Sequence, residues 1–198
     1  NFGLENLSTL VQLKLTTKEA AIAGKTIDQI VLYSAKEQLL KEVLLDASKI
    51  AAGVENRTDL YVTEGTKGTK TIVANSAGIN LATKDNHVNA FITVLPTKDP
   101  VEDLQILIHN ATDGTWATFD KAGTTFGDSK AKVINIDLKA ANFTKSFIAV
   151  DEASLRQAHT EALAAGGGKI KVIGDITLKQ TFSPYNFRTA ANDPKITY

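Results

Sequence analysis

The stretch LQILIHNATDGTWATF, residues 104–119, has the pattern of two β-strands joined by a tight turn. Apolar side chains recur at every second position, at Leu104, Ile106 and Ile108. This period of two is typical of a strand with one buried face. Asp113 and Gly114 then form a dipeptide that favours a hairpin turn, and Trp116 opens the next apolar segment. The stretch therefore predicts an antiparallel hairpin.

The same period runs through most of the first 150 residues. It is found in the segments VQLKLT (11–16), IDQIVLYS (27–34), LYVT (60–63), KTIVA (70–74), KVINIDL (132–138) and FIAV (147–150). The segment NAFITVLP (89–96) is apolar on nearly both faces, which predicts a central strand ending at Pro96. EGTKG (64–68) predicts a turn. About eight or nine short strands with regularly spaced turns predict an antiparallel β-sandwich.

The segment KEQLLKEVLLDASKIAAG, residues 36–53, interrupts this pattern. Leu39, Leu40, Val43 and Leu44 are spaced as on one face of a helix. The segment is interpreted as a helical or mixed crossover, although a pair of strands also fits.

A helix followed by a strand is predicted at VDEASLRQAHTEALAAGGGKIKVIGDITL, residues 150–178. Asp151 is a preferred N-cap residue, and the glycines at 166–168 tolerate the left-handed backbone that ends a helix. In the strand, Ile170 and Val172 are expected to share one face, with a turn or bulge after them. The remaining tail is expected to be loop with one last short strand.

The composition excludes several classes of protein. The 198-residue chain has 22 Lys plus Arg and 22 Asp plus Glu, so it carries no electrostatic footprint for nucleic acid or an anionic membrane. It has no cysteine, which excludes disulfide scaffolds, thiolate metal sites and thiol nucleophiles. Methionine is also absent, even at position 1. We therefore expect a processed or trimmed chain, whose parent could carry a secretory signal or a lipid anchor upstream.

The order of several short motifs is similar to that of the fimbrillin family of Bacteroides-type bacteria. The matching elements are Asn6-Leu7 in NLSTLVQLKLT, Ile27 with Ile30, Leu95-Pro96, and Leu104 to Gly114. The resemblance covers roughly residues 4–150. It implies a transthyretin-like β-sandwich, and a role as a pilus subunit, a pilus tip or a cell-surface lipoprotein.

Residues 150–178 resemble the opening of the right-handed parallel β-helix (pectate-lyase-like) domains of bacterial surface proteins. In those domains a D-x-x-x-L-x-x-A helix caps the solenoid, and I-x-V/L-x-G-D-I-x-L forms its first coil. A capping helix is physically reasonable there because it covers unpaired strand edges. The resemblance implies that residues 150–198 are the truncated head of a second module. Alternatively, these residues complete an α+β architecture of the sandwich itself.

No constellation of side chains predicts catalysis, a cofactor site or a metal site. His87, His109 and His159 lack the spacing of zinc ligands, and His159 is expected at the surface or its boundary. DKAGTTFGDSK (120–130) is interpreted as a plain hairpin because it lacks the dense oxygen ligands of a calcium loop. GGGK (166–169) follows a helix rather than preceding one, so it is interpreted as a helix end and not as a phosphate loop.

Two aromatic residues are the candidate ligand-binding positions. Trp116, the lone tryptophan, follows the predicted turn and could stack on a sugar or a partner, although core packing is the commoner role. Tyr185 lies in the proline-containing tail, where it could anchor a partner or fill a groove in the sandwich.

These patterns predict a mainly β chain with a fimbrillin-like sandwich at 1–149 and a capping helix with the first strands of a β-helix at 150–198. The expected function is non-catalytic adhesion or anchoring at the bacterial cell surface or outer membrane, with the sandwich displaying a C-terminal solenoid. The expected partners are other surface proteins or glycans, with self-association through strand edges and no nucleic acid or cofactor. Two alternatives remain: a strand-exchanging pilus subunit, and a polysaccharide-acting enzyme with its active site on a missing C-terminal region.

Overall fold

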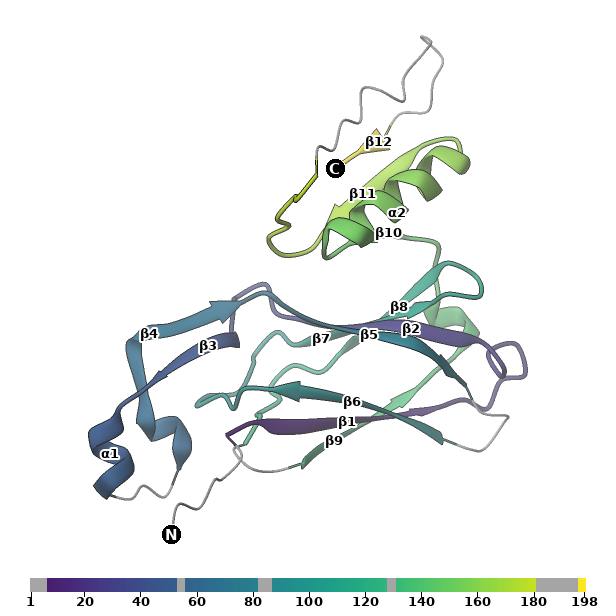
Figure 1. Ribbon diagram of the computed structural model, residues 1–198. Coiled ribbons are helices and arrows are strands. Elements are labelled where there is room, and N and C mark those ends of the chain that lie inside the picture. The colour runs from purple at the N-terminus through teal and green to yellow at the C-terminus, as the bar shows by residue number, and fades with distance from the viewer. Residues whose placement is uncertain (1–6, 53–55, 82–86, 128–130, 181–195) are drawn as a thin grey trace. The chain divides into compact units, whose positions relative to one another are not determined.

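The computed structural model describes residues 7–52, 56–81, 87–127, 131–180 and 196–198 (Figure 1). The chain forms two compact units, Asn1–Thr144 and Lys145–Tyr198. They are called the sandwich unit and the helix–strand unit below. The fold is mainly β with antiparallel sheets, followed by a short helix–strand segment, which confirms the predicted fold class.

Two sheets of the sandwich unit face each other (Figure 1). The first has the strand order β6-β1-β9 and the second the order β5-β2-β7-β8. Their strands are β1 (Thr9–Thr16), β2 (Thr26–Tyr33), β5 (Thr71–Asn80), β6 (His87–Val94), β7 (Gln105–Asn110), β8 (Thr115–Asp120) and β9 (Ala131–Asp137), with a 3₁₀ turn η2 (Ala140–Asn142) after the last. Aliphatic side chains from both sheets, such as Leu13, Ile30, Ile108 and Ile136, form one core between them.

The strand register explains which side chains reach this core. Leu13 of β1 pairs with Ala90 of β6 and with Ile134 of β9, and all three are buried. Phe91 and Val133 are one position away on the same strands, so they lie on the opposite, solvent face. The pairing of β1 with β6 is antiparallel, as predicted, whereas β1 and β9 pair in parallel.

The strand predicted to be central, at 89–96, is an edge strand. In β6 buried and exposed positions alternate, with Phe91 57% exposed and Ile92 5% exposed. The strand with both faces buried is β7, which lies between β2 and β8. The prediction was wrong because an exposed phenylalanine makes the outer face of β6 look apolar in the sequence.

A two-stranded arm extends from the sandwich. It consists of β3 (Leu39–Leu45) and β4 (Tyr61–Thr69), joined by the helix α1 (Ala47–Ala52) and the 3₁₀ helix η1 (Arg57–Leu60). Residues 36–53 are mixed, which is one of the two forms of the crossover interpretation: 39–44 form a strand and not a helix, and Ala47–Ala52 form α1. The strand that pairs with β3 lies outside this segment, so the alternative of a strand pair within it is wrong.

The EGTKG segment (64–68) is part of β4 and not a turn. Its glycines allow close approach of neighbouring chain. A Cβ on Gly65 would lie 2.4 Å from the Cβ of Leu44, and one on Gly68 would lie 2.3 Å from the carbonyl oxygen of Glu37. Both distances are too short for a real side chain, so glycine serves here for packing rather than for turning.

The helix–strand unit contains β10 (Phe147–Ala149), α2 (Glu152–Ala164), β11 (Gly168–Val172) and β12 (Ile196–Thr197). The three strands pair in parallel in the order β10-β11-β12. Leu155, Ala158 and Ala162 of α2 cluster with Ala149 and Ile170 of the sheet. The FIAV segment therefore pairs with β11, and not with a strand of the sandwich as predicted, because its alternation does not specify a partner.

Both predicted ends of α2 are confirmed. The Asp151 side chain accepts a hydrogen bond of 2.7 Å from the backbone N–H of Ser154. After the helix, Gly166 has a φ of +84°. Ile170 and Val172 lie two residues apart on β11 and so on the same face, as expected, but only Ile170 is buried and Val172 is 44% exposed. No described helix has the length and apolar character required to cross a membrane.

Replacing Asp151 with alanine is expected to destabilise the helix–strand unit by about 1 kcal/mol, because the first-turn N–H of Ser154 loses its acceptor. Hydrogen exchange of the first-turn amides of α2 would measure the loss. Asp151→Asn is the matched control, since asparagine caps helices about as well as aspartate. Equal acceleration of exchange in both variants would contradict the assigned cap.

Candidate functional site

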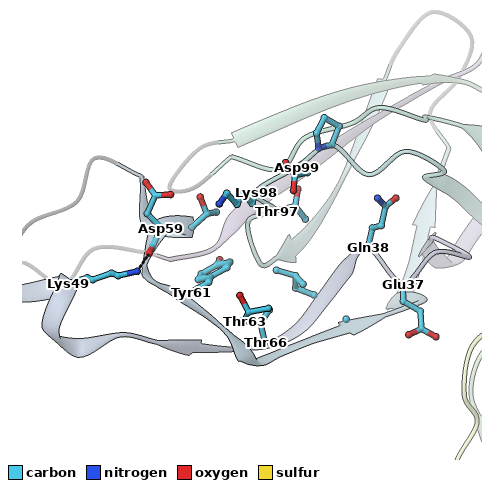
Figure 2. Close-up of a pocket in the computed structure, with 14 residues that line it drawn as sticks. Glu37, Gln38, Lys49, Asp59, Tyr61, Thr63, Thr66, Thr97, Lys98 and Asp99 are labelled. Atoms are coloured by element: carbon cyan, nitrogen blue, oxygen red, sulfur yellow. Dashed lines mark hydrogen bonds between the residues drawn. The ribbon is translucent and has the colours of Figure 1, made fainter.

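A pocket of about 580 Å³ opens in the sandwich unit where the β3–β4 arm meets the loop after β6 (Figure 2). One wall is the arm, with side chains from 58–66 and from α1. The other is formed by the turn at 37–38 and the loop 97–100. The volume is in the range of pockets that hold small molecules, so this is the candidate site.

Hydrogen bonds hold the walls of this pocket, one between the two walls and others within one wall or to the core. The Tyr61 hydroxyl of the arm donates to the carbonyl of Pro96 at 3.2 Å. The backbone N–H of Glu102 donates to Oε1 of Gln38 at 2.9 Å. Thr97 is buried, and its N–H donates to the carbonyl of a core residue, Phe126, at 2.9 Å. The walls are therefore anchored to the sandwich core.

The helical segment at the end of the arm is held by Asp46. Its backbone N–H donates to the carbonyl of Leu60 at 2.8 Å, and its side chain accepts from the backbone N–H of Ser48 at 3.0 Å. Hydrogen bonds from Ser48 lower the pKa of the Asp46 carboxyl. Lys49 then donates to the backbone carbonyl of Asp59 at 3.2 Å, which joins α1 to η1 beside the pocket.

Asp103 fixes the turn that supplies one side of the pocket. Its carboxylate accepts hydrogen bonds from the Ser34 hydroxyl at 2.5 Å and from the Lys36 backbone N–H at 3.0 Å. Burial opposes ionisation of this carboxyl, but the hydrogen bonds from Ser34 and Lys36 outweigh it and hold its pKa below the usual value. The ionised form of Asp103 is therefore the one that holds the turn.

The Asp103→Asn variant is expected to lower the free energy of unfolding by about 1–3 kcal/mol at pH 7, because an amide cannot accept at both positions. The native carboxyl has a lowered pKa, so its stabilising contribution is present above the unfolded pKa of about 3.9 and is lost as pH falls through the lower folded pKa. Urea unfolding at pH 7 and at pH 3, followed by the fluorescence of the lone Trp116, would measure both effects.

Asp99→Asn is the matched control for this variant, since Asp99 is exposed and its substitution is expected to change stability by less than about 0.5 kcal/mol. A difference between Asp103→Asn and the parent chain that is as large at pH 3 as at pH 7 would contradict the role given to the ionised carboxylate.

The structure places one predicted ligand-binding residue away from this pocket and does not describe the other. Trp116 is 6% exposed on β8, and its ring centroid lies 4.7 Å from that of His109, directly opposite on β7. Nδ1 of His109 lies 2.6 Å from Oδ1 of Asp28. A ring so buried offers little surface to a ligand, and a binding role for Trp116 stays a prediction. Tyr185 lies outside the described residues.

The three histidines lie on three different elements. His87 and His109 lie on β6 and β7 of the sandwich unit, and His159 lies on α2 of the helix–strand unit. Contrary to expectation, His159 is buried, and this burial lowers its pKa; its Nδ1 contacts the Tyr198 hydroxyl. Within the described ranges, no group of three or more His, Asp or Glu side chains is arranged to hold a metal ion.

Sequence reasoning did not find the pocket. Its residues come from four separate stretches, so no local motif marks it. The signal that could have found it is the pair Gly65 and Gly68, because glycine inside a strand often marks a close approach of another chain segment. Interpreting these glycines as a turn placed Tyr61 and Thr66 in separate elements, whereas they share β4.

Comparison with known proteins gives limited similarity. No family model and no curated protein matches the chain. Among solved structures, a candidate cell adhesion protein from Bacteroides ovatus is similar, with a TM-score of 0.42 and 14% identity over 69% of this chain and 42% of that one. A pilus-presented adhesin has a TM-score of 0.25 and 14% identity, over 66% of this chain and 27% of that one. The chain spans less than half the length of either structure.

Proposed function

We propose that the chain is a non-catalytic adhesion protein of a bacterial cell surface, in which the sandwich unit displays a binding site. The observation that carries this proposal is the pocket between the β3–β4 arm and the loop 97–100. A rigid sandwich that positions loops for binding is a common arrangement in proteins. Of the sequence motifs that resemble those of fimbrillins, the pair Ile27 and Ile30 lies on β2.

Adhesion is tested with beads coated with the purified chain. We expect them to be retained on mucin-coated glass under flow, and beads coated with serum albumin to be washed off. In the parent bacterium, antibodies against the chain are expected to label intact cells. Labelling only after lysis, or equal retention of both kinds of bead, would contradict the proposal.

We further propose that the helix–strand unit begins a parallel β-helix that the sandwich displays. Support comes from the parallel pairing of β10, β11 and β12, which is the pairing that stacked coils of a β-helix require. Helix α2 packs its apolar side chains on this sheet, as an end cap would. The test is the parent gene's sequence after the codon for Tyr198. Further coils of alternating apolar residues are expected there, and their absence would refute the β-helix proposal.

A pilus subunit that assembles by strand exchange is the second candidate. It is favoured by a smaller groove of about 280 Å³, lined by β2, β5 and β6, where core residues such as Ile30 and Ile92 are reached from outside. An extended segment from another copy could pair there with an edge strand. This candidate predicts detergent-resistant oligomers of the concentrated chain that Ala74→Trp, which fills the groove, would abolish.

A further inference from the structure

We propose that the pocket between the β3–β4 arm and the loop 97–100 binds a short neutral oligosaccharide. This inference rests on the proposed adhesion function and names the chemical class of ligand that its site takes. The pocket is about 580 Å³ in volume, large enough for a ligand of several rings rather than a single ion.

The lining is suited to a ligand with many hydroxyl groups. Small-molecule pockets are usually lined mainly by apolar side chains. Here Thr58, Thr63 and Thr66 bring hydroxyls, and Asp59 and Asp99 bring carboxylates. Carboxylates accept hydrogen bonds, while threonine hydroxyls both accept and donate. A sugar hydroxyl also accepts and donates, so each of these groups can pair with one.

The balance of charge argues for a neutral ligand. Five charged side chains line the pocket, three carboxylates and two lysines. One of the carboxylates, Glu37, forms an ion pair of 3.3 Å with Lys70, and one of the lysines, Lys49, donates to a backbone carbonyl. The pocket therefore lacks the positive excess that a phosphate or sulfate ligand would need.

Tyr61 gives the pocket an aromatic wall. Figure 2 shows it within the pocket, with Thr63 and Thr66 on the same strand. The tyrosine side chain combines an apolar ring with a polar hydroxyl, so the ring can contact the C–H face of a sugar while the hydroxyl forms a hydrogen bond elsewhere. The Tyr61 hydroxyl bonds to Pro96, which fixes the ring before a ligand arrives. Such preorganisation reduces the entropy lost on binding.

Binding of chitotriose, mannotriose and lactose to the whole chain is measured by saturation-transfer NMR and by calorimetric titration. A heparin tetrasaccharide and an unglycosylated threonine-rich peptide are the anionic and peptide arms. We expect at least one neutral sugar to bind. Thr63→Val is expected to weaken that binding about fivefold or more, and Tyr61→Ala about tenfold or more. Thr93→Val, on the exposed face of β6 outside the pocket, is the matched control and is expected to bind as the parent chain does.

Tyr61→Phe separates ring contact from tethering. It keeps the ring and removes the hydrogen bond to Pro96, so we expect a loss of affinity of about twofold to threefold from lost preorganisation, clearly smaller than the loss in Tyr61→Ala. Asp99→Asn replaces a carboxylate that accepts at two oxygens with an amide that accepts at one, so it is also expected to weaken sugar binding. If Tyr61→Ala fails to fold, as judged by Trp116 fluorescence, Thr63→Val and Asp99→Asn still decide the matter. If Tyr61→Phe lost as much affinity as Tyr61→Ala, the hydroxyl and not the ring would account for the effect, and the proposed contact of the ring with the sugar would be wrong.

The inference is overturned if none of the neutral sugars binds at millimolar concentration, if only the heparin fragment or the peptide binds, or if Thr63→Val and Asp99→Asn both bind like the parent chain. Bead retention distinguishes this failure from that of the adhesion proposal. Bead retention by a chain that binds none of the neutral sugars in solution leaves adhesion standing and refutes the saccharide site. Sugar binding in solution without retention or surface labelling leaves the saccharide site standing and refutes adhesion.

Discussion

Truncation of Phe126 to alanine is expected to lower the free energy of unfolding of the sandwich unit by about 3–5 kcal/mol. Phe126 is fully buried and belongs to the core between the two sheets. Removing its ring takes away both the transfer free energy of the apolar surface and the contacts of its neighbours, which collapse only partly into the space. Urea unfolding followed by Trp116 fluorescence would report the change in this unit.

Phe126 also connects the core to the candidate site through its backbone. The carbonyl of Phe126 accepts from the N–H of Thr97, a residue of the pocket wall. Phe126→Leu is the control, since it keeps most of the apolar volume and is expected to cost clearly less than the alanine variant. If both variants left the unfolding midpoint unchanged, Phe126 could not be a core residue.

Ile92→Ala is expected to cost about 2–5 kcal/mol, while Phe91→Ala changes the stability by less than about 0.5 kcal/mol. The two residues are neighbours on β6, but Ile92 is 5% exposed and Phe91 57% exposed. The larger side chain therefore has the smaller effect, because burial and not size sets the cost. Paired urea titrations would measure the difference, and a reversed order would mean that β6 presents its other face to the core.

The sequence was sufficient to predict strands whose outer face is polar. In β1 and β9 the apolar residues at alternate positions, such as Leu13 and Ile134, are the ones that are buried. Strand order was harder to predict, because it depends on which edges meet in space and not on the pattern within one segment. Phe91 made an edge strand look central, and the parallel pairing of β1 with β9 left no local signal.

The helix–strand unit was predicted well at the level of local structure, because helix ends depend on a few adjacent residues. Asp151 caps α2, and the glycines from Gly166 end it. The pocket could not be predicted in this way. Tyr61 and Pro96 meet only because the β3–β4 arm reaches the loop after β6, and this contact depends on the tertiary fold.

The parallel pairing of β1 with β9 has a consequence for how the chain matures. Residues Leu10–Thr16 leave the ribosome more than a hundred residues before their partners on one side, Ala131–Asp137. Contacts between segments so distant in sequence form slowly, because a long loop must close first. Until then one side of β1 has an unsatisfied backbone edge that other nascent chains can join. Strand β1 is thus among the last strands of the sandwich unit to have both of its edges paired.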